Sequence, residues 1–344
     1  MSGTDATVLP SRDHYRLKYP NRPAQLASVM EKPRRIFLDT AHLVNIARLR
    51  RGEYVPDRFR VAYAHLDAYI QSRRYSVIFS LSSPLDWVDG DATLESALNI
   101  AYVIDSSANR LFFEGDQFLF LHELLCECLR VQPGLRIPHF PIFQEIVSGK
   151  TIRTGLGTLV NEVPRFASDI ETIDGAFPVE IPAPYAAPSV QLTWQRKQSS
   201  PATYHERVHG FGDALDRDIK GRPDGTIHRQ DIHNWTKHFL KVDIVLRALN
   251  SQITVDEVID QVDWDRCPAI QLYIKARAKR IRAAFSAKAN DVDDWANLPI
   301  IPYCDLFLTD RAFREFILQA DKSLAHIVHS DPRSAAEALG PCVP

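Results

Sequence analysis

Three short, mainly hydrophobic runs predict buried β-strands, at residues 35–38, 76–80 and 306–309. Unbroken apolar runs of this length are typical of strands in a parallel sheet, where both faces are covered. The first run leads into a helical pattern, in which apolar residues recur every three positions from Leu43 until the pattern stops at Gly52. Helical patterns also follow the other two runs. The sequence therefore predicts strands that alternate with helices around a parallel sheet.

Between the second and third runs the chain is mainly helical, so we predict a domain that is interrupted by an insertion. Its first part covers residues 34–110, and its closing part and C-terminal helix cover 288–344. The insertion covers residues 111–287, and it contains a proline-rich loop at 175–190. Residues 1–33 carry four prolines and mixed charge, and we expect them to form an irregular N-terminal arm.

Composition and charge limit the classes of function that the chain can have. Hydrophobic residues make up 45% of the 344 positions and charged residues 24%, as in ordinary globular proteins. The net charge of -2 means that any binding to nucleic acid must come from local basic patches. The five cysteines are scattered without a CxxC pair, which favours reduced thiols and a cytoplasmic protein. We find no signal sequence or membrane-spanning segment, and we expect no membrane partner.

Three acids follow the ends of the three predicted strands. Asp39 comes directly after the first strand, Asp86 a few residues after the second, and Asp310 after the third. Ligands of parallel α/β sheets bind beyond the carboxyl ends of the strands, so we expect these acids to converge. Clustered carboxylates repel one another unless a cation lies between them, and oxygen ligands without Cys or His favour Mg²⁺ or Mn²⁺. The pattern therefore predicts a metal site.

The segments RRIFLDT and CDLFLTDRAF resemble motifs of the PIN-like (PilT N-terminal-like) nuclease superfamily. Members of this family bind Mg²⁺ or Mn²⁺ through three or four acids and cut RNA or structured DNA. The resemblance implies that Asp39 is the metal ligand after the first strand and that Asp310 is the acid of the closing motif. It also implies that Asp86 is the mid-domain acid, although most members of the family have Glu there.

The remaining acid of the family opens the helix before the closing strand, and three aspartates compete for this role. Asp294 matches best, and Asp291 and Asp293 stay open as alternatives. Asp305 precedes the last predicted strand, which spans about 13 Å if it has four residues. We therefore expect Asp305 to serve the turn into that strand, at the opposite edge of the sheet from Asp310.

A basic segment, KARAKRIRAAFSAK, lies directly before the proposed closing motif and contains six Lys or Arg residues and no acid. It could be an ordinary solvated helix face. Alternatively, its charges neutralise the phosphates of a nucleic acid that is led toward the acids. The predicted nucleic-acid-binding residues are Lys275, Arg277, Lys279, Arg280 and Arg282.

The predicted function is a metal-dependent nuclease in which the four acids Asp39, Asp86, Asp294 and Asp310 hold Mg²⁺ or Mn²⁺. The metal activates water for hydrolysis of a phosphodiester bond. Of the two nucleic acids we favour RNA over DNA as substrate, and we expect the insertion to shape access to the site or to bind a protein partner.

Three other functions compete with the nuclease. One is a PIN-like nucleic-acid-binding or assembly module without catalysis, in which Asp39 and Asp310 only cap the helices that follow them. Another is a phosphatase with Asp39 as nucleophile, but its DxD motif would need an acid at position 41, which is Ala. A zinc site at His205 and His209 lacks the HExxH pattern.

Overall fold

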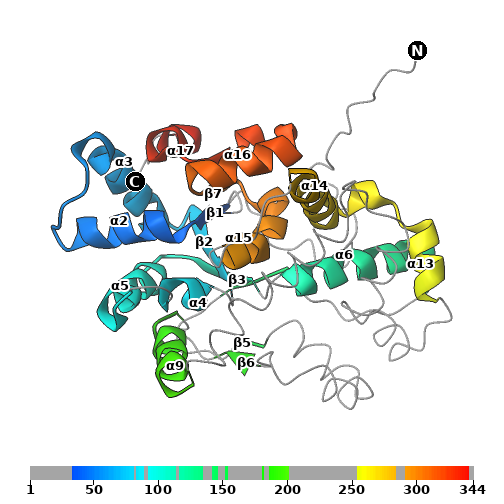
Figure 1. The fold of residues 1–344 in the computed structure, drawn as a ribbon, viewed down its shortest axis with the longest axis horizontal. Helices are drawn as coiled ribbons and strands as arrows, with labels where there is room; N and C mark the ends of the chain where they lie inside the picture. The colour runs from blue at the N-terminus through cyan, green and yellow to red at the C-terminus, as the bar shows by residue number, and fades with distance from the viewer. Residues whose placement is uncertain are drawn as a thin grey trace, which may run out of the picture.

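The centre of the computed structural model is a six-stranded sheet in the order β4-β3-β2-β1-β7-β8 (Figure 1). The strands are β1 (Arg34–Leu38), β2 (Tyr75–Ser80), β3 (Arg110–Phe113), β4 (Phe143–Glu145), β7 (Leu306–Leu308) and β8 (Val328–His329). All neighbouring strands are parallel except β3 and β4. The structure describes residues 33–80, 83–88, 92–113, 116–134, 142–145, 152–153, 180–181, 186–200, 254–283 and 291–340.

Helices cover both faces of the sheet. One face carries α2 (Thr40–Arg50), α3 (Asp57–Gln71), α4 (Ser83–Val88), α5 (Leu94–Asp105) and α17 (Pro332–Leu339), with α9 (Ala186–Ser199) packed against α4 and α5. The other face carries α6 (Asp116–Val131), α13 (Val255–Gln261), α14 (Pro268–Ala283), α15 (Asp291–Asn297) and α16 (Arg311–Ala320). Short 3₁₀ helices are η1 (Trp264–Arg266), η2 (Leu298–Tyr303) and η3 (Lys322–His326), and β5 (Ile152–Arg153) pairs with β6 (Glu180–Ile181).

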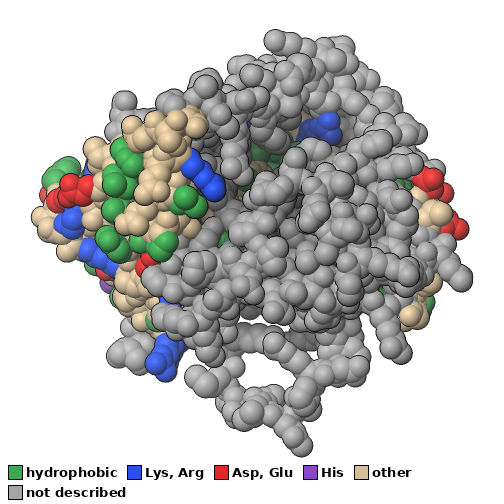
Figure 2. Space-filling model, turned by 90° about the horizontal axis from the view of Figure 1, so that it is seen from below, with side chains coloured by type: hydrophobic (Ala, Val, Ile, Leu, Met, Phe, Trp, Pro, Cys, Tyr) green, Lys and Arg blue, Asp and Glu red, His purple; other side chains and the backbone are tan. Residues whose placement is uncertain are grey.

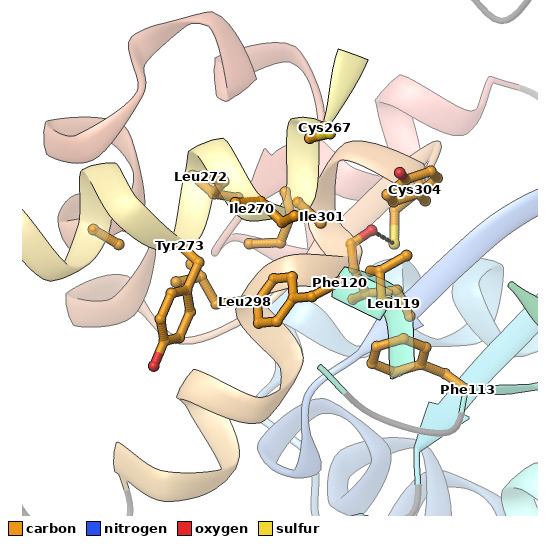
Figure 3. Packing of buried hydrophobic residues seen from close by; sticks show 14 of the residues in the cluster. Phe113, Leu119, Phe120, Cys267, Ile270, Leu272, Tyr273, Leu298, Ile301 and Cys304 are labelled. Atoms are coloured by element: carbon orange, nitrogen blue, oxygen red, sulfur yellow. Dashed lines mark hydrogen bonds between the residues drawn. The ribbon is translucent and has the colours of Figure 1, made fainter. Parts of the chain in front are cut away.

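The two hydrophobic cores follow from the alternation of side chains along the strands. In β1, Ile36 and Leu38 point toward α2 and α3, whereas Phe37 points toward the opposite core. There Phe37 stacks on Phe307 of β7, with ring centroids 4.6 Å apart. Figure 3 shows further members of this second core, in which side chains from α6, α14 and η2 meet. Both faces of the sheet are therefore buried, which explains the unbroken apolar runs.

The prediction of an α/β fold with a parallel sheet is confirmed, and all three predicted strands are present at their expected places. The sheet does not end at residue 110, however, where we predicted the first part of the domain to end. β3 crosses that boundary and β4 lies beyond it, and α6 and α14 pack on the sheet itself. The described parts of residues 111–287 thus contribute to the central layers.

Some predicted segments lie outside the described residues. These are the arm at 1–32, most of the proline-rich loop, and both His205 and His209. Among the helices that the structure describes, none has the length and apolar character needed to cross a membrane.

Candidate functional site

Asp39 lies at the junction between β1 and α2, in the middle of the sheet. Its backbone N–H donates to the Leu308 carbonyl over 2.9 Å, which extends the pairing of β1 with β7 by one residue. Its side chain is the N-cap of α2, where Oδ1 accepts a hydrogen bond from the Thr40 N–H at 2.6 Å. Oδ2 accepts from the Thr309 hydroxyl at 3.3 Å. The Asp39 carboxylate is therefore held by hydrogen bonds from two residues that lie far apart in the sequence, Thr40 and Thr309.

Asp310 occupies the equivalent position after β7. It is the N-cap of α16, and its Oδ1 accepts from the backbone N–H groups of Ala312 at 2.6 Å and Phe313 at 2.9 Å. Its Oδ2 accepts no hydrogen bond within the described part of the chain, and the side chain is exposed. Both predicted strand-end acids therefore cap helices, as the competing structural explanation expects. One oxygen of Asp310 stays open to solvent or to a ligand.

A cavity of about 30 Å³ lies at the carboxyl ends of β1, β2 and β7. A volume of this size holds one or two water molecules, or an ion. Its polar lining residues are Asp39, Thr40, Ser83, Asp294, Asn297 and Thr309. The cavity therefore brings together two of the predicted acids, Asp39 from β1 and Asp294 from α15, and all of its polar side chains carry oxygen.

The charge of Asp39 is unfavourable in this position. Burial raises the pKa of the Asp39 carboxyl above its ordinary value. His42 and the hydrogen bond from Thr40 oppose this shift, while the nearby carboxylate of Asp310 raises the pKa further. Since Asp310 acts on Asp39 through space, the two acids are close enough to repel each other. A cation between or beside them would relieve that repulsion and favour the ionised form of Asp39.

A buried histidine that the sequence did not reveal links the two acid-bearing junctions. His42 on α2 is 6% exposed, with its Nε2 at 3.2 Å from the Thr309 carbonyl and its Nδ1 at 2.9 Å from the Tyr63 hydroxyl. A carbonyl can only accept, so Nε2 carries the proton and Nδ1 accepts from Tyr63. Burial lowers the pKa of His42, whereas its hydrogen bond with the Thr309 carbonyl and the charge of Asp39 raise it. The sequence did carry one signal for this residue: His42 is a polar residue about one turn after Asp39, and it adjoins the buried apolar positions Leu43 and Ile46 of α2.

The other acids that we predicted or held open fall into two groups. Asp86 belongs to α4, whose Ser83 and Trp87 line the cavity, but its side chain is outside the described part, as are those of Asp291 and Asp293. Asp305 lies at the opposite edge of the sheet from Asp310, as the strand length predicts. Its Oδ2 accepts from the Arg35 N–H at 2.8 Å, at the start of β1. Asp305 is therefore not part of the cavity.

The basic helix α14 is partly engaged inside the protein. Lys275 forms an ion pair with Asp321 at 2.7 Å. Arg280 is 5% exposed, and its guanidinium carbon lies 5.5 Å from the centroid of the Trp295 ring. This burial leaves Arg280 little surface to offer a phosphate, because α14 packs against η2 and α16. Arg277 and Lys279 are half-buried, and the side chain of Arg282 is outside the described part.

Figure 2 shows one side of the molecule, where the visible described residues include hydrophobic, basic and acidic side chains interspersed with one another. Within the described ranges, no three Asp, Glu, His or Cys side chains are grouped closely enough to form a ready-made metal site. The arrangement is instead a pair of acids, Asp39 and Asp294, in one cavity, with Asp310 near enough to raise the pKa of the Asp39 carboxyl. Comparisons with protein-family models, with curated proteins and with solved structures found no match to this chain.

Proposed function

We propose that this protein is a metal-dependent nuclease of the PIN-like type, which hydrolyses phosphodiester bonds of RNA in preference to DNA. The observation that carries the proposal is the cavity at the carboxyl ends of three parallel strands. It is lined by Asp39 and Asp294, which come from distant parts of the sequence, and Asp310 lies close enough to Asp39 to raise its pKa. Acids that meet in this way at the edge of a parallel sheet are placed to bind a ligand.

The side chains around the cavity fit a hard divalent cation. Carboxylates, hydroxyls and an amide oxygen are the ligands that Mg²⁺ and Mn²⁺ prefer, and no sulfur or imidazole lines the cavity. Such a cation, when bound, lowers the pKa of a coordinated water and neutralises charge on a phosphodiester. Asp39 and Asp294 would hold it from two sides, with Asp310 and Asp86 as the further acids.

The other residues of the site would position these ligands. The Thr309 hydroxyl donates to Asp39 and thereby fixes the orientation of the carboxylate. His42 holds the carbonyl of the same threonine, which connects α2 to the turn that carries Asp310. Because Asp39 and Asp310 are fixed by helix caps, and Asp39 also by the Thr309 hydroxyl, these two acids would lose little side-chain entropy on binding a metal.

A second candidate function is supported by the same caps. Asp39 and Asp310 each satisfy backbone N–H groups at the start of a helix, which gives both acids a structural role without catalysis. The protein would then be a PIN-like module that binds nucleic acid or a protein partner. The two functions differ in metal dependence, so one experiment can separate them.

The test is cleavage of labelled single-stranded RNA, single-stranded DNA and flapped duplex DNA in Mn²⁺, with EDTA as a control. Asp39→Asn and Asp310→Asn are the informative variants, because Asn caps helices about as well as Asp but carries no charge. We expect both variants to keep the thermal stability of the fold and to lose cleavage by roughly 100-fold or more. RNA should be cut faster than either DNA.

Asp331→Asn is the matched control. Asp331 follows β8 and caps α17, so it repeats the strand–Asp–helix arrangement, but it pairs with Arg333 and does not line the cavity. This variant should cut as well as the wild type. Full activity in Asp39→Asn and Asp310→Asn would rule out the nuclease assignment. Absence of any cutting by the wild type, with nucleic acid still bound in EDTA, would support the binding module.

A further inference from the structure

Asn297 is the last residue of α15, and the oxygen of its side chain is unusual for a buried polar atom. The residue is 8% exposed, and its Oδ1 is buried without a hydrogen-bond partner among the described residues. It lines the same cavity as Asp39 and Asp294. Its neighbours in sequence, Trp295 and Leu298, are fully buried. The amide therefore reaches the cavity from inside the core.

A buried amide oxygen without a hydrogen-bond partner destabilises the folded protein. Burying a hydrogen-bonding group without a partner costs about 1–3 kcal/mol, and native proteins leave few such groups unpaired. A leucine has the same number of side-chain heavy atoms as asparagine, in the same branched arrangement, and would avoid this cost. Unpaired buried polar groups concentrate at functional sites, where a ligand completes them.

The chemistry of the surroundings identifies the ligand. Asp39 and Asp294 place carboxylates around the cavity, which disfavours any anion and favours a cation. Asp294 and Asn297 are three residues apart on α15, so both lie on the same side of the helix. A carboxamide oxygen is a neutral, hard ligand that suits Mg²⁺, Mn²⁺ or Ca²⁺.

We propose that Asn297 is a cation ligand, whose Oδ1 joins Asp39 and Asp294 in holding a divalent metal ion in this cavity. The inference rests on the proposed function and adds to it a neutral ligand that is not an acid. The amide supplies a further oxygen ligand without adding another negative charge near Asp39. The ionised form of Asp39 is already disfavoured by burial and by the charge of Asp310.

The test compares Asn297→Leu with the wild type, in the full chain, by thermal unfolding and by Mn²⁺ titration followed by electron paramagnetic resonance. Because leucine removes the unpaired amide, the metal-free variant should be at least as stable as the wild type. Its affinity for Mn²⁺ should fall by at least about 10-fold, as is typical when a supporting ligand is lost. Higher stability combined with weaker metal binding is the expected result.

Asn109→Leu is the matched control, because the amide of Asn109 is paired. Its Nδ2 donates to the Arg73 carbonyl at 2.6 Å, beside the start of β2 and away from the cavity. This variant should show the reverse pattern, with lower stability and unchanged Mn²⁺ affinity. Asn297→Asp provides a second test that does not depend on leucine fitting the site, since it should destabilise the metal-free protein and bind Mn²⁺ more tightly than the wild type.

The outcomes distinguish failure of the inference alone from failure of the proposed function. If Asp39→Asn weakens Mn²⁺ binding but Asn297→Leu binds Mn²⁺ like the wild type, Asn297 only contacts solvent and the inference is overturned, while the nuclease proposal stands. If the wild type binds no Mn²⁺, both fall together. If Asn297→Leu fails to fold, unchanged or weaker Mn²⁺ binding by Asn297→Asp relative to the wild type overturns the inference.

Discussion

At the scale of single residues, the candidate site is made of polar side chains inside an apolar layer. Asp39 is held by Thr40 and Thr309, and His42 by Tyr63 and the Thr309 carbonyl. Asp39 and His42 each have a hydrogen-bond partner that comes from another element of the fold. His42 is therefore predicted to matter for stability as well as for the geometry of the acids.

Replacing His42 with Phe should lower the free energy of unfolding by about 1–3 kcal/mol. Phenylalanine fills a similar volume, but it leaves the buried Thr309 carbonyl without its donor and the Tyr63 hydroxyl without its acceptor. Urea unfolding measures the change as a lower midpoint with an unchanged slope. His326→Phe is the control, because His326 is exposed, and it should change the stability by less than about 0.5 kcal/mol. Equal midpoints for the two variants would contradict the assigned hydrogen bonds.

The residues of the site differ in how far the sequence predicts them. Asp39 and Asp310 could be located because each directly follows an apolar run that forms a strand. His42 and Asn297 could not, because their importance depends on what surrounds them after folding. The position of a residue in a helix does not show which group it faces after folding. For His42 that group is the Thr309 carbonyl, and for Asn297 it is the cavity.

At the scale of elements, apolar runs identified the central strands, whereas the outer strands were not predicted. β8 has only two residues, and the RLFF segment of β3 follows a polar stretch and begins with Arg110. The helices next to the strands were predicted well, because their apolar residues recur at helical spacing. The basic pattern of α14 did not show that Arg280 would be buried, since that depends on the packing of η2 and α16.

The junction between α6 and α14 depends on one buried acid. The oxygens of Glu123 on α6 accept from the Ala269 N–H at 2.9 Å and the Ile270 N–H at 3.1 Å, at the start of α14, and from the Tyr303 hydroxyl. Burial raises the pKa of Glu123 from 4.5 to about 7, although these hydrogen bonds oppose the shift. Folding therefore favours the protonated acid.

Stability should fall between pH 4.5 and pH 7 because of this group. The unfolded chain releases the proton near pH 4.5, whereas the folded chain keeps it until about pH 7. The contribution of Glu123 is thus fully present below the lower pH and is lost as the pH rises through the higher one, with a total change of about 3 kcal/mol. Glu123→Gln should flatten this part of the profile in urea unfolding. Glu337→Gln, on an exposed position of α17, should keep the wild-type profile. Parallel profiles for wild type and Glu123→Gln would contradict the assignment.

At the scale of the whole molecule, the two ends of the described chain form one sheet. β1 pairs with β2 on one side and with β7 on the other, and Phe37 stacks on Phe307 across the latter pair at an interplanar angle of 7°. The prediction that the first and last segments belong to one α/β unit follows from the apolar runs. Their order in the sheet does not, because strand order is fixed by long-range pairing.

A double-mutant cycle should measure this link between the ends. Phe37→Ala and Phe307→Ala should each lower the free energy of unfolding by about 3–5 kcal/mol, since both rings are buried. The double variant should lose less than the sum, by about 0.5–1.5 kcal/mol, because the stacked pair is lost only once. Urea unfolding of the four proteins gives the coupling. Additive changes would show that the two rings do not interact.

The central position of β1 also affects how the protein folds during synthesis. The Thr309–Asp39 hydrogen bond joins residues 270 positions apart. At about 5–20 residues per second, a ribosome needs roughly 15–50 s to add that length of chain. For that period β1 has an unpaired edge toward the missing β7, and the acidic cavity lacks one wall. A nascent chain of this protein would need protection from aggregation, and the proposed metal site would stay incomplete until its final strands had emerged.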